Sequence, residues 1–214
     1  MLFNAGLDIK EITDDNNDRR LYKLNMTILL VINSEENSIM NGLVHVYTGD
    51  GKGKTTAAVG LAVRACGAGL KVLFVQFLKS NYTSELASFE KLSPAIDIKR
   101  GCSFKKFVWN MNSEELSEAK KEAGEIFDIV KNELNSAKYD MVILDEILGT
   151  MTNGFIDEAS LVELIKQKPS EVELVLTGRG ATQGIISVAD YVSEIVAIKH
   201  PYEKGIGSRK GIEL

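Results

Sequence analysis

The chain has 214 residues, 44% of them hydrophobic and 26% charged, which is ordinary globular composition and enough length for one well-buried domain. Its formal charge of -5 disfavours wholesale binding to nucleic acid or to an anionic membrane surface, and leaves a local site for a small anion. The two cysteines, Cys66 and Cys102, form no Cys-x-x-Cys pair and fit a reducing compartment. The apolar run at residues 26–32 is far shorter than the roughly 20 residues of a membrane helix. No secretory cleavage site follows it, so we expect a cytoplasmic protein with no membrane partner.

Residues 1–39 are polar and lack the period of a helix or a strand. Residues 34–37 can be encoded by a purine-rich stretch a few codons before Met40, as a ribosome-binding site would be. Met40 is therefore a candidate natural start, which would make residues 1–39 a translated leader. The alternative is a genuine flexible or partner-wrapping arm, and the two interpretations stay equally open. In either case the folded domain is predicted at residues 40–214.

After residue 42, short apolar runs alternate with longer amphipathic stretches, a pattern typical of a parallel sheet covered on both faces. Buried strands are predicted at residues 43–47, 72–77, 141–145 and 173–178, and edge strands at residues 95–100 and 194–200. The clearest helix is predicted at residues 112–135, where Asn112 and Glu115 form a candidate capping box. Its apolar stripe comprises Leu116, Ala119, Ala123, Ile126, Phe127, Val130 and Leu134. These elements predict a single α/β domain with a mainly parallel sheet and helices on both of its faces.

A glycine-rich turn, TGDGKGKTT at residues 48–56, lies between the first predicted strand and a small-residue helical run. Gly49, Gly51 and Gly53 give the backbone freedom to surround an anion, Lys54 adds a charge, and Thr55 adds a hydroxyl for a magnesium ion. The general pattern G-x-x-x-x-G-K-[ST] has glycine where this chain has Thr48. A chance glycine cluster is the alternative, and the position between strand and helix argues against it. The sequence therefore predicts a P-loop NTPase-like domain.

Two carboxylates, Asp145 and Glu146, follow the apolar strand at residues 141–145. Ligands of open α/β sheets bind at the carboxyl ends of the strands. Carboxylates at that edge can hold Mg²⁺ directly or through water beside a triphosphate. An ordinary acidic strand end is the alternative, and the nearby phosphate loop favours the metal site.

Two arginines are further candidates for contacts with phosphate. Arg179 lies between two glycines in LTGRG at another strand end, where it could bind a phosphate or simply belong to a structural turn. Arg64 lies on the helix after the loop, where a solvated charge is equally plausible. Neither histidine fits a catalytic role: we interpret His45 as a hydrogen-bonded core residue and His200 as a surface residue.

Five motifs together resemble one known family: GLVHVYTGDGKGKTTAAVGLAVRACGAGLKVLFVQFLKS, FVWNM, VILDEI, LTGRG and the tail IKHPYEKGIGSRKGIE. From about Gly42 onward the chain is similar to the P-loop ATP:corrinoid adenosyltransferases, also called cob(I)alamin adenosyltransferases. That family shares the loop with threonine in place of glycine. The resemblance implies transfer of the 5′-deoxyadenosyl group of ATP to Co(I) of a reduced corrinoid, such as cobalamin or its cob(I)yrinic acid a,c-diamide precursor. Tripolyphosphate would be the second product.

The resemblance also implies roles for residues, cofactors and partners. Lys54, Thr55 and Glu146 would be catalytic, and Thr55, Asp145 and Glu146 would hold Mg²⁺ or Mn²⁺. Phe107 and Trp109 would pack on the lower face of the corrin, whereas from the sequence pattern alone we would place them in a hydrophobic core. A flavoprotein-type reductase would supply electrons, and the enzyme would be a homodimer. The residues implied in ATP binding are Gly49, Asp50, Gly51, Lys52, Gly53, Lys54, Thr55, Thr56, Arg64 and Arg179.

Two other functions remain compatible with the same motifs. A generic P-loop ATPase or small-molecule kinase would use the loop and the acidic pair for phosphoryl transfer. A non-catalytic ATP- or corrinoid-binding protein would hold its ligands without reaction. The products distinguish these cases, because only adenosyl transfer releases tripolyphosphate.

Overall fold

The computed structural model describes residues 11–12, 21–22, 41–79, 82–101 and 108–213. The chain divides into two compact units, Met1–Met40 and Asn41–Leu214. In the first unit the described residues form two short antiparallel strands, β1 (Glu11–Ile12) and β2 (Leu21–Tyr22). Most of residues 1–39 lies outside the described residues, so the translated leader and the arm both stay predictions.

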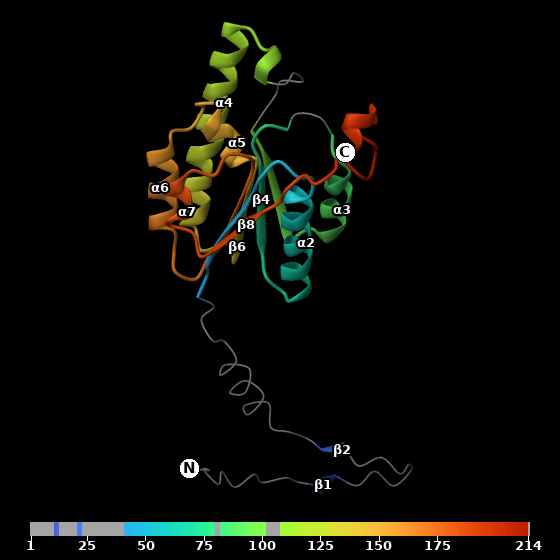
Figure 1. Cartoon of the computed structure of the whole chain (residues 1–214). Helices are drawn as coiled ribbons and strands as arrows, with labels where there is room; N and C mark the ends of the chain where they lie inside the picture. Colours follow the sequence, from blue (N-terminus) through green and yellow to red (C-terminus); the bar gives the residue numbers. More distant parts are fainter. Residues whose placement is uncertain (1–10, 13–20, 23–40, 80–81, 102–107, 214) are drawn as a thin grey trace. The chain divides into compact units, whose positions relative to one another are not determined.

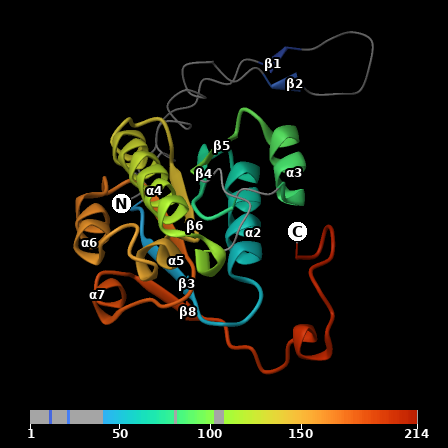
Figure 2. The ribbon, with the colours of Figure 1, turned by 90° about the horizontal axis from the view of Figure 1, so that it is seen from above.

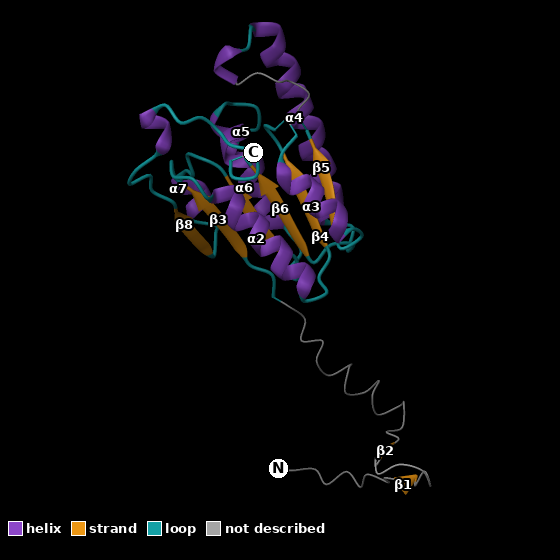
Figure 3. Cartoon of the chain, turned by 90° about the vertical axis from the view of Figure 1, so that its right-hand side faces the viewer, coloured by secondary structure: helices purple, strands orange, loops and turns teal. Residues whose placement is uncertain are grey.

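The second unit is built on a six-stranded sheet in the order β5-β4-β6-β7-β3-β8, and every neighbouring pair in it is parallel. Figure 3 shows these strands side by side. The predicted α/β class with a parallel sheet is confirmed. The strands are β3 (Val44–Thr48), β4 (Val72–Gln76), β5 (Ile96–Arg100), β6 (Met141–Asp145), β7 (Glu173–Thr177) and β8 (Tyr191–Glu194).

The two ends of the sheet test the predicted edge strands differently. β5 lies at one edge of the sheet, so the edge strand predicted at residues 95–100 is confirmed. The strand predicted at residues 194–200 was wrong, because β8 ends at Glu194, where that prediction began. β8 pairs with β3 only as far as Thr48, and beyond it the backbone of Ile195 bonds to the glycine-rich loop. The apolar residues that suggested a strand, Val196 and Ile198, are 66% and 89% exposed.

Helices cover both faces of the sheet (Figures 1 and 2). On one face α2 (Lys54–Gly67) and α3 (Ser84–Leu92) pack on a core that includes Phe74 and Ile143. On the other face lie α4 (Ser113–Leu134), α5 (Ile147–Thr152), α6 (Glu158–Gln167) and α7 (Gln183–Ile186). Two short 3₁₀ turns, η1 (Val108–Asn110) and η2 (Pro201–Lys204), complete the elements. Within the described residues, no helix is long and apolar enough to cross a membrane.

Helix α4 follows the predicted pattern closely. The Asn112 side chain accepts a hydrogen bond from the Glu115 N–H, and the Glu115 carboxylate accepts one from the Asn112 N–H, so the capping box is confirmed. Of the predicted stripe, Leu116 is half-buried and the other six residues are buried in the core. This helix is therefore a structural support of the sheet.

The parallel sheet brings the candidate site together. Because all six strands run the same way, their carboxyl ends lie at one edge, where open α/β sheets bind ligands. The neighbours β3, β7 and β6 end there in Thr48, Thr177 and Asp145. The glycine-rich loop follows β3 at the same edge and leads directly into α2.

Candidate nucleotide-binding site

The glycine-rich loop is closed by its own lysine. The Lys54 ammonium donates to the carbonyl oxygens of Gly49 at 2.7 Å and of Gly51 at 2.8 Å. Gly49 and Gly53 have φ values of 97° and 130°, which residues with a side chain rarely adopt. Only 8% of Lys54 is exposed, and this burial lowers the pKa of its ammonium, partly offset by the charge of Glu146. A positive charge is thus held at the N-terminus of α2, where an anion is favoured.

The loop is also anchored from outside, by three hydrogen bonds that the sequence interpretation missed. The Gly51 N–H donates to the Ile195 carbonyl at 2.7 Å, and the Ile195 N–H donates to the Thr48 carbonyl at 2.8 Å. The Thr48 hydroxyl accepts a hydrogen bond from the Ala181 N–H at 3.3 Å. Thr48, which replaces the glycine of the general pattern, therefore ties the loop to the segment after β7. The buried Thr48 hydroxyl thereby gains the hydrogen-bond partner that a buried polar group needs.

Asp145 is the centre of a hydrogen-bond network at the end of β6. It is fully buried, and its Oδ1 accepts from the hydroxyls of Thr55 at 2.9 Å and Thr177 at 2.7 Å. Its Oδ2 accepts from the Lys79 ammonium at 2.8 Å. Thr177 was not predicted as a site residue, although it lies in the quoted LTGRG motif. The structure thus links Thr55 at the start of α2 with β6 and β7.

Glu146 follows in an unusual backbone conformation. Its φ of 63° and ψ of 19° are left-handed, and its N–H donates to the Thr177 hydroxyl at 3.0 Å. Burial, with a further contribution from the Asp145 charge, raises the pKa of the Glu146 carboxyl. A half-buried carboxyl with a raised pKa beside a buried aspartate, at the carboxyl edge of the sheet, is a candidate functional residue.

The donor set suits a hard divalent cation. The Thr55 hydroxyl and the Asp145 carboxylate are oxygen ligands of the kind Mg²⁺ prefers, and Mg²⁺ is usually held by one or two carboxylates plus water and substrate phosphates. The Lys79 ammonium lies 3.2 Å from the Thr55 hydroxyl as well as 2.8 Å from Asp145, so a positive charge already bridges these oxygens. Among the described residues there is no group of three or more His, Cys, Asp or Glu side chains that could hold a metal alone.

The remaining predicted ATP-binding residues lie around the loop and along α2. Arg179 is exposed, and its Nε lies 3.5 Å from an oxygen of Asp50 in the loop. Lys52 and Thr56 are also exposed. Arg64 is exposed in the last turn of α2, about 14 Å along the helix from Thr55 at a rise of 1.5 Å per residue. The structure therefore places Arg179 at the loop and Arg64 away from it.

The aromatic pair predicted to contact the corrin lies largely outside the described residues. Phe107 falls in residues 102–107, which are not described, and of Trp109 only the backbone is described, in η1. The roles of both residues stay predictions.

Both histidines lie apart from the loop and Asp145. The His45 Nε2 pairs with Glu173, and its ring stacks on Tyr191 with centroids 4.6 Å apart. His45 is therefore hydrogen-bonded, as expected, although its side chain keeps 15% exposure. His200 is half-buried and its Nδ1 accepts from the Tyr202 N–H at 3.3 Å, at the start of η2.

Gly178 allows β7 to approach α5 closely, and its replacement should be costly. Its φ is 138°, and an added Cβ would lie 2.8 Å from the Gly149 nitrogen and 2.9 Å from the Leu148 Cβ. Gly178→Ala should lower the free energy of unfolding by roughly 1–3 kcal/mol. The melting temperature should then fall by about 2–4 °C for each kcal/mol. The matched control is Gly60→Ala on α2, where an added Cβ meets nothing within 4 Å and a slight stabilisation is expected. Equal melting temperatures for the two variants would contradict the close approach.

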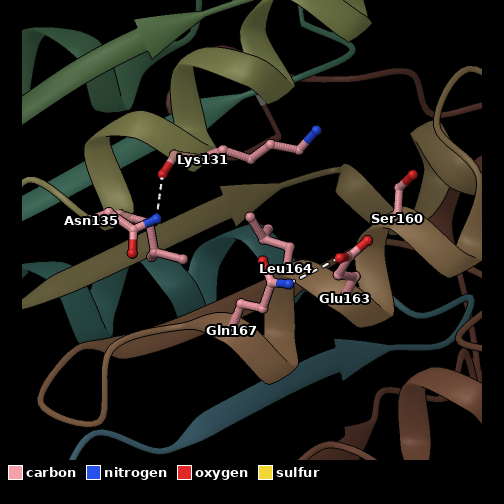
Figure 4. A pocket seen from close by; sticks show the side chains of 7 residues that line it. Lys131, Asn135, Ser160, Glu163, Leu164 and Gln167 are labelled. Carbon is pink, nitrogen blue, oxygen red and sulfur yellow. Dashed lines mark hydrogen bonds between the residues drawn. The ribbon is translucent and has the colours of Figure 1, made fainter.

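A pocket of about 220 Å³ lies between α4 and α6 (Figure 4). The Gln167 amide donates to Glu163 at 2.9 Å, and the Asn135 amide donates to the Lys131 carbonyl at 2.8 Å. None of the predicted site residues lines this pocket, so it is separate from the loop and its carboxylates. Its lining comprises Lys131, Leu134, Asn135, Ser160, Glu163, Leu164 and Gln167.

The fold and the site together define a P-loop nucleotide-binding α/β protein. A lysine-closed glycine loop joins the first strand of a parallel sheet to a helix, and a buried aspartate on a neighbouring strand end bonds to the threonine after that lysine.

Comparison with known proteins defines the class more narrowly. Residues 40–214 match the family model described as ATP:corrinoid adenosyltransferase BtuR/CobO/CobP. The corrinoid adenosyltransferase of Escherichia coli strain K12 is 33% identical over 176 residues, covering 80% of this chain and 85% of that protein. The corrinoid adenosyltransferase of a Sinorhizobium species is 36% identical over 181 residues, which cover 81% of this chain and 80% of that protein. The corrinoid adenosyltransferase of Pseudomonas aeruginosa is 31% identical over 173 residues, which cover 81% of this chain and 84% of that protein. Among solved structures, flagellar accessory protein FlaH from Methanocaldococcus jannaschii has a TM-score of 0.49 at 12% identity, covering 87% and 80%. The chain belongs to the ATP:corrinoid adenosyltransferase family, which confirms the resemblance drawn from its motifs.

Proposed function

We propose that this adenosyltransferase joins the 5′ carbon of ATP to the Co(I) centre of a reduced corrinoid and releases tripolyphosphate. The cobalt electron pair forms the cobalt–carbon bond. The bond between the 5′ carbon and its oxygen breaks, and the departing triphosphate keeps that electron pair. Cobalt is formally oxidised from Co(I) to Co(III), the adenosyl group is the alkyl ligand, and no proton is transferred.

The observation that carries the proposal is the pair formed by the lysine-closed loop and the Asp145 network. Negative charge grows on the triphosphate as it departs, and fixed positive groups at that position lower the barrier. Lys54 lies buried in the loop, and Thr55 follows it at the start of α2. We infer that Lys54 and the loop bind the triphosphate, while Thr55, Asp145 and Glu146 hold Mg²⁺. The ion, when bound, would neutralise phosphate charge and orient the leaving group.

The reaction also fits a site to which neither histidine of the chain contributes. A metal nucleophile that already carries its electron pair needs no general base. The two histidines of the chain are engaged elsewhere, His45 with Glu173 and His200 at the start of η2.

The products of ATP separate the proposal from its rivals. The protein should be incubated anaerobically with ATP, Mg²⁺ and chemically reduced cobalamin, and the phosphates analysed. Adenosyl transfer gives tripolyphosphate in step with the loss of Co(I). ADP or inorganic phosphate as the main product would instead establish an ATPase or kinase, and unchanged ATP a binding protein.

Phe107 and Trp109 test the corrin side of the proposal. If they exclude the lower axial ligand of cobalt, Phe107→Ala or Trp109→Ala should impair turnover that starts from Co(II) with a weak reductant. The defect should shrink when Co(I) is supplied directly, because the nucleophile is then already formed. Equal losses in both assays, with a lower melting temperature, would assign the two residues to core packing. The flavoprotein reductase and the homodimer stay predictions.

A further inference from the structure

A lysine from outside the loop occupies the position of a cation at the site. Lys79 lies three residues beyond β4, and its ammonium lies 2.8 Å from Asp145 Oδ2 and 3.2 Å from Thr55 Oγ1. Both oxygens belong to residues assigned above to a divalent cation. Glu85 on α3 lies 3.9 Å from the same ammonium. Lys79 was absent from the predicted site residues.

The ammonium and a divalent ion would compete for these oxygens. Mg²⁺ requires oxygen ligands at about 2.0–2.1 Å in near-octahedral geometry. An ammonium that donates to the same oxygens would lie within a few ångströms of the ion, where two positive charges repel each other strongly in a partly buried site. Binding of a divalent cation at this position is therefore favoured when the Lys79 side chain moves away from it.

The surroundings of Lys79 allow its side chain to move while its backbone stays in place. The Lys79 carbonyl accepts a hydrogen bond from Arg100 Nη2 at 2.7 Å, which holds the main chain. The side chain is 24% exposed, and a lysine stem has four rotatable carbons. Glu85, one of the carboxylates near it, already accepts from the Gln76 amide at 2.9 Å. A triphosphate bound at the loop would place additional negative charge beside Thr55, within reach of the Lys79 side chain.

We propose that Lys79 is the counter-cation of Asp145 and Thr55 before ligands bind, and that it moves onto the triphosphate when a divalent ion takes its place. Before substrate arrives it holds Asp145 and Thr55 in position. The site then rejects a free divalent cation and accepts one only together with a polyphosphate that receives Lys79. This inference rests on the proposed binding of ATP and metal, and is independent of what happens to the adenosyl group.

The test measures binding of Mn²⁺ alone and of Mn²⁺ with tripolyphosphate, by calorimetry and by the electron paramagnetic resonance of free Mn²⁺. Compared with the unaltered protein, Lys79→Met should bind Mn²⁺ alone about tenfold or more tightly, because the competing charge is gone. The same variant should bind the Mn²⁺–tripolyphosphate pair about tenfold more weakly, because a charge-assisted hydrogen bond to phosphate is lost. The two effects have opposite signs, whereas a merely structural role would weaken both.

The controls keep the result interpretable. Lys99→Ala removes an ammonium that pairs with Glu133 at 3.1 Å, and it should change neither affinity. Lys79→Gln provides a second neutral variant should Lys79→Met fold poorly, and melting temperatures without ligand monitor folding. An unchanged or weaker affinity for Mn²⁺ alone in the neutral variants would overturn the proposal. Because the test measures binding and not turnover, the expected changes in affinity for Mn²⁺ and for Mn²⁺–tripolyphosphate do not depend on whether the protein transfers the adenosyl group.

Discussion

Lys54→Ala should lower turnover at saturating ATP and Mg²⁺ by about a hundredfold or more, the size of effect seen when a preorganised electrostatic group is removed. Lys54 is the buried lysine of the loop, and its ammonium is held by the carbonyls of Gly49 and Gly51. Because Lys54 is buried, its ammonium is desolvated when the protein folds and not during the reaction. The measurement is initial-rate turnover with chemically reduced cobalamin, together with the melting temperature.

Lys120→Ala is the control for this prediction. Lys120 carries the same charge on the exposed surface of α4, so its removal should have a small effect that disappears at higher salt. Lys54→Met keeps the apolar stem and removes the charge, which separates electrostatics from packing. Near-normal turnover in Lys54→Ala at saturating ATP would show that Lys54 does not stabilise the departing triphosphate.

Asp145→Asn should produce the second large loss, again about a hundredfold in turnover at fixed Mg²⁺. The amide oxygen can still accept from Thr55 and Thr177. The amide NH₂ group would face the Lys79 ammonium, and since both groups are donors, the hydrogen bond between Lys79 and residue 145 would be lost. Loss of this hydrogen bond to a charged group should also destabilise the fold by about 1–3 kcal/mol. Turnover measured across a Mg²⁺ series should show a weaker apparent affinity for the ion.

Asp140→Asn tests whether the effect belongs to the position. Asp140 immediately precedes the same strand at its opposite end, where its carboxylate accepts from the Lys71 N–H at 2.7 Å in an exposed setting. That variant should keep normal turnover and normal dependence on Mg²⁺. Equal behaviour of the Asp145 and Asp140 variants would remove Asp145 from the proposed metal site.

The sheet could be predicted because its central strands are buried on both faces. Residues 72–75 and 141–144 are apolar and buried throughout, because a strand covered on both faces needs apolar side chains at consecutive positions. The strand predicted at residues 194–200 was wrong for the opposite reason. β8 is exposed along its whole length and its position is set by pairing with β3, which ends where the loop begins. Pairing of that kind is a tertiary contact and leaves no period in the sequence.

The loop and its acidic partner could be predicted because each belongs to a local pattern at a strand end. Lys79 and the Thr48 contact could not, since both depend on distances between strands that only the folded sheet fixes. Gln76 at the end of β4 is in register with Asp145, so the chain just beyond β4 lies beside the carboxylate. A search of polar residues just beyond every predicted parallel strand would have included Lys79.

The most direct test of the central claim follows the 5′ carbon of ATP. The protein should be supplied anaerobically with Mg²⁺, chemically reduced cob(I)alamin and ATP that carries ¹³C at the 5′ position of its ribose. Carbon NMR should show the label in the corrinoid product, bonded to cobalt and released by light, while the phosphate product is tripolyphosphate. Label that stays in adenosine phosphates while ADP accumulates would contradict the account and show that the loop serves phosphoryl transfer.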